Sequence, residues 1–152
     1  MRVKLICQLF LGVILSISAV LISSCDNEQI DDQIPFVSFP DIIINLKSQQ
    51  YLALQSVGHV TIDGGLRGII LRKSTFANDY TAYERNCSYQ PNDACALVEV
   101  APSGLSMQDP CCGSSFDFSQ GNPTGGPARS PLRRYRTSLS GDILTITDEP
   151  LN

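Results

Sequence analysis

The fold of this chain is indicated by one stretch of sequence: Asp109-Pro110-Cys111-Cys112-Gly113-Ser114-Ser115-Phe116-Asp117, continued by Gly125-Gly126-Pro127-Ala128-Arg129-Ser130-Pro131-Leu132. All of it except Leu132 lies within residues 101–131, where glycine, proline and serine are most frequent. A loop of this length inside a small domain is either functional or disordered. The cysteines within and just before it favour an ordered loop, because disulfide bonds are the default outside the cytosol.

This stretch resembles the second cluster-binding box of Rieske 2Fe-2S proteins, which in that family reads Cys-Pro-x-His-Gly-Ser-x-Phe/Tyr-Asp and ends in Gly-Pro-Ala-x-x-Pro-Leu. The family's cysteine ligand falls on Asp109, and its histidine ligand falls on Cys112. The first box, Cys-x-His-x-x-Cys, corresponds to residues 87–95, with a longer spacing between its cysteines. The four cluster positions therefore read Cys87, Tyr89, Asp109 and Cys112, and only Cys87 matches the family.

The resemblance implies a scaffold that has lost its iron ligands. A Rieske centre binds one iron through two cysteines and the other through two histidines, whereas this chain has a single histidine, His59, upstream of both boxes. We therefore expect no 2Fe-2S cluster, no other cofactor and no metal ion. The alternative is a 2Fe-2S electron-transfer protein with atypical ligands. A zinc site made of all four cysteines is disfavoured, because structural zinc usually binds cysteines about two to four residues apart within each pair.

The expected fold is all-β. The resemblance covers roughly residues 41 to 149 and implies a Rieske-like sandwich or barrel with an inserted, disulfide-stapled loop subdomain. Short β-branched or alternating runs and turn residues also predict strands and hairpins; the strands are expected at 42–46, 57–62, 67–72, 80–84, 96–100, 132–137 and 143–147. One or two helical turns are expected at 48–55, with Ser48 as the cap and Tyr51, Leu52 and Leu54 facing inward.

Four cysteines of this domain permit three pairings. High-potential Rieske proteins carry a disulfide between the last cysteine of the first box and the cysteine beside the histidine of the second box. For this chain the resemblance therefore implies a Cys95–Cys111 disulfide. Cys87 and Cys112, at two former ligand positions, are then left as partners of one another. A bond between the neighbours Cys111 and Cys112 would require a strained ring, so we rank it last.

Residues 1–24 have the pattern of a lipoprotein signal peptide. Arg2 and Lys4 precede an apolar run at 5–22, and small residues lead into Cys25. A run of this length can also be an uncleaved membrane anchor, but the basic start and the small residues before Cys25 favour removal. We expect an acylated Cys25 to anchor the protein to a lipid bilayer in the bacterial cell envelope, at the outer membrane, on its periplasmic or its surface face.

Residues 25–40 are expected to be a flexible tether, acidic and poor in bulky apolar side chains at 26–33. The acidic residues are similar to the surface-export signal of Bacteroidetes lipoproteins, and a solvated spacer is the equal alternative. The formal charge of −4 becomes −6 once Arg2 and Lys4 are removed. An acidic domain repels phosphate backbones, which excludes nucleic acid as a partner and leaves an envelope protein as a possible one.

No catalytic residues are expected. A hydrolase needs a nucleophile with a base, and His59 lies in a strand-like run rather than beside a candidate nucleophile. A thiol oxidoreductase normally carries Cys-x-x-Cys at a helix start, and the chain has no such motif. The sequence thus predicts a lipid-anchored binding or structural module rather than an enzyme.

Overall fold

The computed structural model describes residues 33–74 and 79–151. The predicted signal peptide at 1–24, the lipidation site Cys25 and the first part of the tether lie outside the described residues, and they stay predictions. Among the described residues, no helix is long and apolar enough to cross a membrane.

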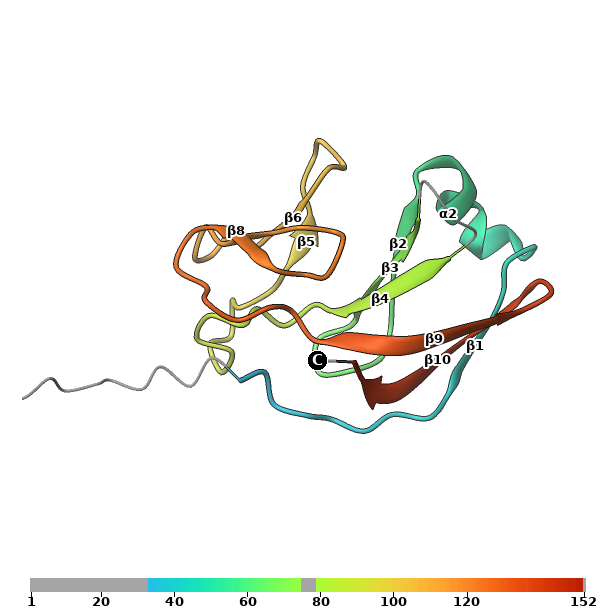
Figure 1. Cartoon of the computed structure of the whole chain (residues 1–152), viewed down its shortest axis with the longest axis horizontal. Coiled ribbons are helices and arrows are strands. Elements are labelled where there is room, and N and C mark those ends of the chain that lie inside the picture. The colour runs from blue at the N-terminus through green and yellow to red at the C-terminus, as the bar shows by residue number, and fades with distance from the viewer. Residues whose placement is uncertain (1–32, 75–78, 152) are drawn as a thin grey trace, which may run out of the picture.

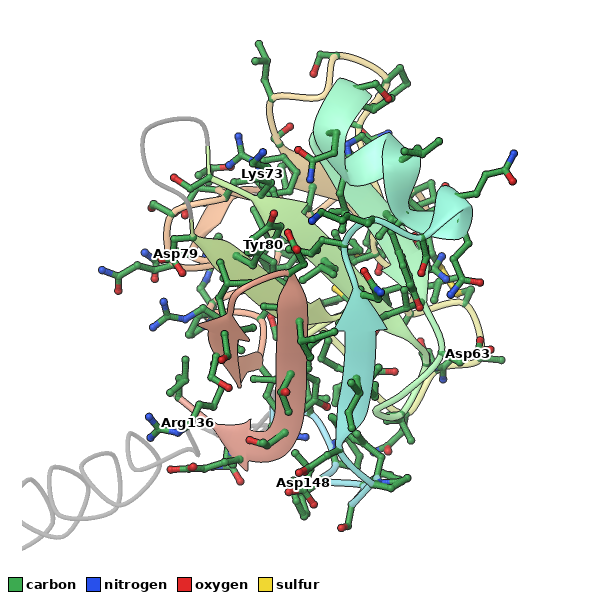
Figure 2. The ribbon with its side chains drawn as sticks, turned by 90° about the vertical axis from the view of Figure 1, so that its right-hand side faces the viewer. Asp63, Lys73, Asp79, Tyr80, Arg136 and Asp148 are labelled. Atoms are coloured by element: carbon green, nitrogen blue, oxygen red, sulfur yellow. A yellow bond between two sulfur atoms is a disulfide. The ribbon has the colours of Figure 1, made fainter. Side chains whose placement is uncertain are left out.

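The fold is all-β, as predicted, and its larger sheet is antiparallel with six strands in the order β1-β10-β9-β4-β3-β2 (Figure 1). The strands of this sheet are β1 (Ile42–Asn45), β2 (His59–Ile62), β3 (Ile69–Lys73), β4 (Tyr80–Glu84), β9 (Arg134–Ser140) and β10 (Ile143–Pro150). The two predicted hairpins are present, β2 with β3 and β9 with β10. At one end of the sheet Lys73 pairs with Tyr80, and Figure 2 shows these two residues near one another.

A short helical segment follows β1, at the predicted place. It consists of a 3-10 turn, η1 (Gln49–Tyr51), and the helix α2 (Leu52–Ser56). Leu54 is buried as expected, but Leu52 is 53% exposed, so its predicted inward orientation is wrong. With only five residues the helix presents a narrow apolar face, and Leu54 occupies it.

A four-stranded antiparallel sheet, in the order β5-β6-β7-β8, is inserted between β4 and β9. Its strands are β5 (Glu99–Val100), β6 (Met107–Gln108), β7 (Ser115–Phe116) and β8 (Pro123–Gly125). Figure 1 shows this small sheet, coloured yellow to orange, at one side of the larger sheet. It is the predicted inserted loop subdomain. The strand expected at 96–100 is shorter than predicted, because only Glu99 and Val100 pair with β6, while Leu97 forms an isolated bridge with Asn86.

The small sheet packs against the larger one through β3 and β4. Ile70 and Tyr83 share one hydrophobic cluster with Met107 and Phe116 of the small sheet. Ile69, by contrast, belongs to a second cluster within the larger sheet. Successive side chains of a strand point to opposite faces, so β3 contributes to both cores. This double burial fixes the loops of the small sheet relative to the larger sheet.

A buried carboxylate joins the turn before β3 to β4 and β9. Glu84, the last residue of β4, is completely buried and accepts a hydrogen bond from the Tyr135 hydroxyl at 2.7 Å. The turn is tight at Gly65, which has a φ of +61°, and a Cβ there would lie 2.2 Å from Glu84 Oε2. Glycine is therefore required at this position.

Candidate functional site

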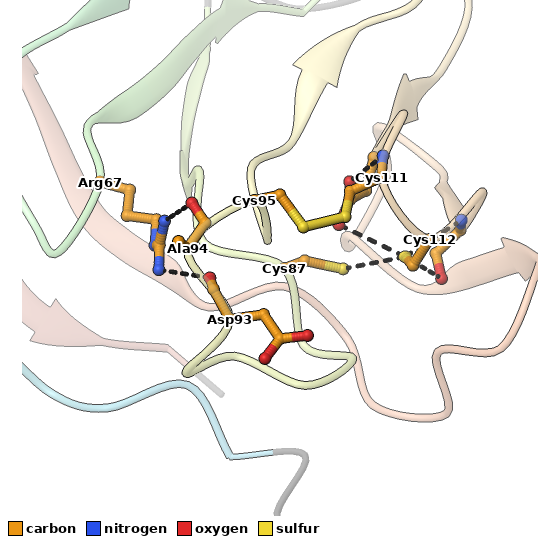
Figure 3. The surroundings of a disulfide bond; sticks show 9 residues. Arg67, Cys87, Asp93, Ala94, Cys95, Cys111 and Cys112 are labelled. Carbon is orange, nitrogen blue, oxygen red and sulfur yellow. Dashed lines mark hydrogen bonds between the residues drawn. A yellow bond between two sulfur atoms is a disulfide. The ribbon is translucent and has the colours of Figure 1, made fainter.

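The predicted Cys95–Cys111 disulfide is present, with Cα atoms 5.9 Å apart. Cys95 lies in the segment between β4 and β5, and Cys111 lies in the turn between β6 and β7. The first of these segments is also held by Arg67, whose guanidinium donates to the carbonyl oxygens of Asp93 and Ala94 (Figure 3). The tips of the two loops that correspond to the cluster boxes are thus joined covalently.

The structure differs from the prediction for the second cysteine pair. Cys87 and Cys112 are free thiols, and their Sγ atoms are 3.8 Å apart, whereas a disulfide needs about 2.05 Å. Figure 3 shows the two side chains pointing toward one another beside the Cys95–Cys111 bond. The predicted proximity of the two loops is therefore correct, but a Cys87–Cys112 bond is not formed.

The Cys112 sulfur is held by two oxygen atoms of its own loop. It lies 3.3 Å from Asp109 Oδ2 and 3.1 Å from Ser114 Oγ. A carboxylate oxygen only accepts, so the single thiol proton goes to Asp109 and the Ser114 hydroxyl donates to sulfur. Ser114 Oγ in turn accepts from the Ala128 N–H at 3.1 Å. With these contacts in place, Cys112 Sγ lies at contact distance from Cys87 Sγ, 3.8 Å away.

Asp109 occupies a position that is ligand-bearing in the family, and here it organises the turn. It is 1% exposed, and its Oδ1 accepts from the Cys111 backbone N–H at 2.8 Å. Its second oxygen, Oδ2, is the one that faces Cys112. The same carboxylate therefore fixes the loop backbone with one oxygen and presents the other to the sulfurs.

Gly126 allows the covering loop to approach this turn. A Cβ on Gly126 would lie 2.5 Å from Ser114 Cα and 2.6 Å from the Gly113 carbonyl oxygen, and the φ of Gly126 is +81°. Any side chain there would displace the backbone of the turn that carries Cys112 and Ser114. The glycine-rich character of this segment is thus a packing requirement of the site.

The thiol of Cys87 is fully buried. Burial raises its pKa, and the neighbouring Asp109 carboxylate adds to the increase. In the absence of a cation, Cys87 is therefore a neutral thiol and a poor nucleophile. This property argues against Cys87 as the attacking thiol in a thiol-exchange reaction.

A pocket of about 290 Å³ lies against the site. It is lined by Tyr89, Gln90, Asp93, Ala96, Asp109, Cys111, Cys112 and Pro127. Tyr89 is half-buried and packs against the core that contains Cys87. The four degenerate cluster positions, Cys87, Tyr89, Asp109 and Cys112, are thus gathered in one region, as the resemblance implies.

Three further residues lie outside the four former cluster positions. His59 lies on β2, in the larger sheet, and does not line the pocket at the cysteines. Phe116 is completely buried in the core of the small sheet, consistent with a filling role. Asp117 accepts hydrogen bonds from the backbone N–H groups of Ser119 and Gln120, and it thereby caps the turn that follows β7.

The residues present do not fit a Rieske cluster. In the family's pattern Cys87 binds one iron and the residue at Cys112 binds the other, so the inorganic core would separate them. Sulfur atoms 3.8 Å apart are in contact instead. The remaining two positions offer the oxygens of Asp109 and Tyr89, whereas a Rieske centre is bound by thiolate and imidazole.

Comparison with solved structures shows the fold. The cyanobacterial plasma membrane Rieske protein PetC3 from Synechocystis PCC 6803 is 20% identical, with a TM-score of 0.52, over 63% of this chain and 92% of that protein. A complex of reduced oxygenase and oxidized ferredoxin in carbazole 1,9a-dioxygenase matches with a TM-score of 0.46 and 14% identity, over 62% of this chain and 83% of that chain. The ferredoxin of carbazole 1,9a-dioxygenase from Nocardioides aromaticivorans IC177 matches with a TM-score of 0.44 and 16% identity, over 60% of this chain and 86% of that chain.

The chain therefore has a Rieske-like fold. No protein-family model matches it, and a comparison with curated proteins gives no significant match.

Sequence reasoning missed the roles of Ser114 and Glu84. The serine was visible within the quoted stretch, but its contact with Cys112 depends on the loop returning through Ala128. Glu84 ends an alternating run and has no local pattern that marks it as buried.

Proposed function

We propose that this Rieske-like domain holds no 2Fe-2S cluster and acts as a non-catalytic binding or structural module, attached to the bacterial cell envelope through an acylated Cys25. The fold supplies two loops that meet at their tips. In this chain the Cys95–Cys111 disulfide links those loops, and three of the four former ligand positions, Tyr89, Asp109 and Cys112, line a pocket.

One observation carries the proposal: the four cluster positions cannot supply the ligands that a Rieske centre needs. The Cys87 and Cys112 sulfurs are in contact at 3.8 Å, and Asp109 offers a carboxylate oxygen at a position where a Rieske centre needs a thiolate. His59, the single histidine of the sequence, lies on β2 of the other sheet. An electron-transfer role would need a different ligand set.

Reconstitution of the full chain with iron and sulfide under anaerobic conditions tests cluster loss. We expect no absorbance at about 400–600 nm beyond that of unbound iron sulfide, and no acid-labile sulfide that stays with the protein after desalting. Two iron and two sulfide per chain, with a reversible change in absorbance on reduction, would establish the alternative, a 2Fe-2S electron-transfer protein with atypical ligands.

The anchoring part of the proposal depends on Cys25. PetC3, which has the same fold, is a plasma membrane protein, and we propose membrane association for this chain through lipid. Cys25→Ser is expected to abolish incorporation of labelled palmitate and to release the protein from membranes, because lasting attachment requires acyl chains. Cys7→Ser, in the apolar part of the signal, is the matched control and should stay membrane-bound. Continued labelling of Cys25→Ser would contradict lipidation at this residue.

A further inference from the structure

We propose that Cys87, Cys112 and Asp109 form a binding site for a single Zn²⁺ ion. The three side chains each offer one ligand atom, and these atoms lie within 4.8 Å of one another. This inference rests on the proposed function, because a domain that held a 2Fe-2S cluster would use the same positions differently.

The spacing of the ligand atoms is that of one tetrahedral ion. A Zn–S bond of about 2.3 Å and tetrahedral angles place two sulfur ligands about 3.8 Å apart, and a sulfur and an oxygen about 3.6 Å apart. The Cys87–Cys112 sulfur separation is 3.8 Å, and Cys112 Sγ is 3.3 Å from Asp109 Oδ2. These two edges of the tetrahedron are therefore close to their final lengths before an ion binds.

The donor set selects the ion. Two thiolates favour thiophilic ions such as Zn²⁺ and Cu⁺ over Mg²⁺ and Ca²⁺. The carboxylate of Asp109 favours Zn²⁺ over Cu⁺, because zinc binds carboxylate oxygen in proteins at about 2.0–2.2 Å. Two thiolates and one carboxylate also compensate the charge of a divalent ion in a site where Cys87 and Asp109 are buried.

The surroundings support bound thiolates. Asp109 Oδ1 stays bonded to the Cys111 N–H while Oδ2 is free to turn from thiol acceptor to metal ligand. Cys112 Sγ accepts from the Ser114 backbone N–H at 3.4 Å and lies beside the Ser114 hydroxyl. Such partners orient the side chains that bind the metal and raise its affinity. On binding, Zn²⁺ forms two Zn–S bonds and one Zn–O bond, and the two thiol protons are released to solvent.

The pocket of about 290 Å³ gives the ion a route of entry, since Asp109 and Cys112 line it. Three protein ligands leave the fourth position to water or to a ligand from the pocket, which is the arrangement of an open zinc site. The nearby Cys95–Cys111 disulfide removes two competing thiols. The disulfide therefore restricts zinc to the thiols of Cys87 and Cys112 and the carboxylate of Asp109.

The test uses the full chain, purified anaerobically from membranes, with its thiols counted by alkylation and peptide mapping. We expect one zinc per chain to remain after dialysis against zinc-free buffer. Substitution by Co²⁺ should give thiolate-to-cobalt charge transfer and the intense visible bands of a tetrahedral site. Zinc should also protect Cys112 from alkylation.

Matched variants locate the ion. Asp109→Asn keeps the Oδ1 acceptor for the Cys111 N–H and is expected to weaken zinc binding at least about tenfold. Cys112→Ser should weaken it further and remove part of the charge-transfer absorption. Asp93→Asn, an exposed acid of the same pocket, is the control and should change affinity less than about twofold.

The outcomes separate this inference from the function on which it rests. Iron with sulfide and visible absorbance would overturn both. If the protein retains neither zinc nor cobalt while Cys87 and Cys112 are fully alkylated, the zinc site is overturned and the proposal of a cluster-free domain still stands. A Cys87–Cys112 disulfide in the anaerobically isolated protein would also overturn it, as would equal loss of affinity in Asp93→Asn and Asp109→Asn.

Discussion

The buried carboxylate of Glu84 offers the sharpest test of how this fold is held together, and the perturbation is Glu84→Gln. Glu84 accepts four hydrogen bonds: from the backbone N–H groups of Leu66 at 2.8 Å, Arg67 at 3.0 Å and Asn86 at 3.1 Å, and from the Tyr135 hydroxyl at 2.7 Å. The side chain is completely buried. All four partners donate, so a carboxylate satisfies them and an amide cannot.

The magnitude follows from the geometry. If the glutamine NH₂ group replaces Oε2, the Tyr135 hydroxyl can turn to accept, but the Leu66 N–H then faces another donor. In the opposite orientation, the N–H groups of both Arg67 and Asn86 are left unpaired. One unpaired buried donor costs about 1–3 kcal/mol, and the bonds that remain lose the strength of a charged acceptor, so we expect a loss of about 2–4 kcal/mol.

Chemical and thermal unfolding measure this loss. An unfolding entropy of about 2.1 cal/mol/K per residue over roughly 110 residues converts it to a fall in Tm of about 9–17 °C. Glu99→Gln is the matched control: Glu99 is exposed and its ion pair with Arg85 is 3.9 Å long, so its effect should stay within about 0.5 kcal/mol. A Glu84→Gln protein as stable as the Glu99→Gln protein would refute the reasoning.

Three further predictions concern the loops. Cys95→Ala/Cys111→Ala opens a link between residues 16 positions apart and should cost about 3 kcal/mol in urea unfolding under non-reducing conditions; a loss below about 1 kcal/mol would contradict the chain-entropy argument. For Asp117, desolvation raises the pKa, but hydrogen bonds from Ser119, Gln120 and Gly121 together hold it below its ordinary value. The contribution of the Asp117 carboxylate to stability is therefore present above its unfolded-state pKa and is lost as pH falls through its folded-state pKa. Asp117→Asn should reduce the fall in the free energy of unfolding at acidic pH, and an unchanged fall would contradict this prediction. Gly126→Ala should be less stable than Gly141→Ala by at least about 1 kcal/mol, because both have positive φ but only Gly126 has backbone atoms within 3 Å of the new Cβ; equal losses would show that the loop shifts freely.

Local sequence patterns predicted most of the strands. The hairpin at Asp63-Gly64-Gly65 and the one at Ser140-Gly141-Asp142 were recognisable, because such turns need residues that tolerate positive φ. The exposure of Leu52 was not predicted, since the apolar face of so short a helix cannot be assigned from spacing alone. The short pairing of β5 was missed for a related reason: the ladder ends where its partner β6 ends, which is a non-local fact.

The candidate site was only partly predictable. The resemblance located the two loops and implied the Cys95–Cys111 disulfide, which the structure contains. The resemblance also implied that Cys87 and Cys112 lie close together, but as a disulfide, whereas the structure has two thiols with their sulfur atoms 3.8 Å apart. The difference lies in the contacts of Asp109 and Ser114 with the Cys112 sulfur, which depend on side-chain positions that no spacing rule encodes.

Residue types and their local patterns were enough to predict that the chain is all-β and that cysteines order its glycine-rich loop. That a Rieske ligand set is missing was implied by the family resemblance together with the single histidine of the sequence. Only the tertiary structure decided that Glu84 is buried among four donors and that two thiols and a carboxylate converge beside a pocket. Both arrangements join residues from strands and loops distant in the chain, and their geometry is set by how the two sheets pack together.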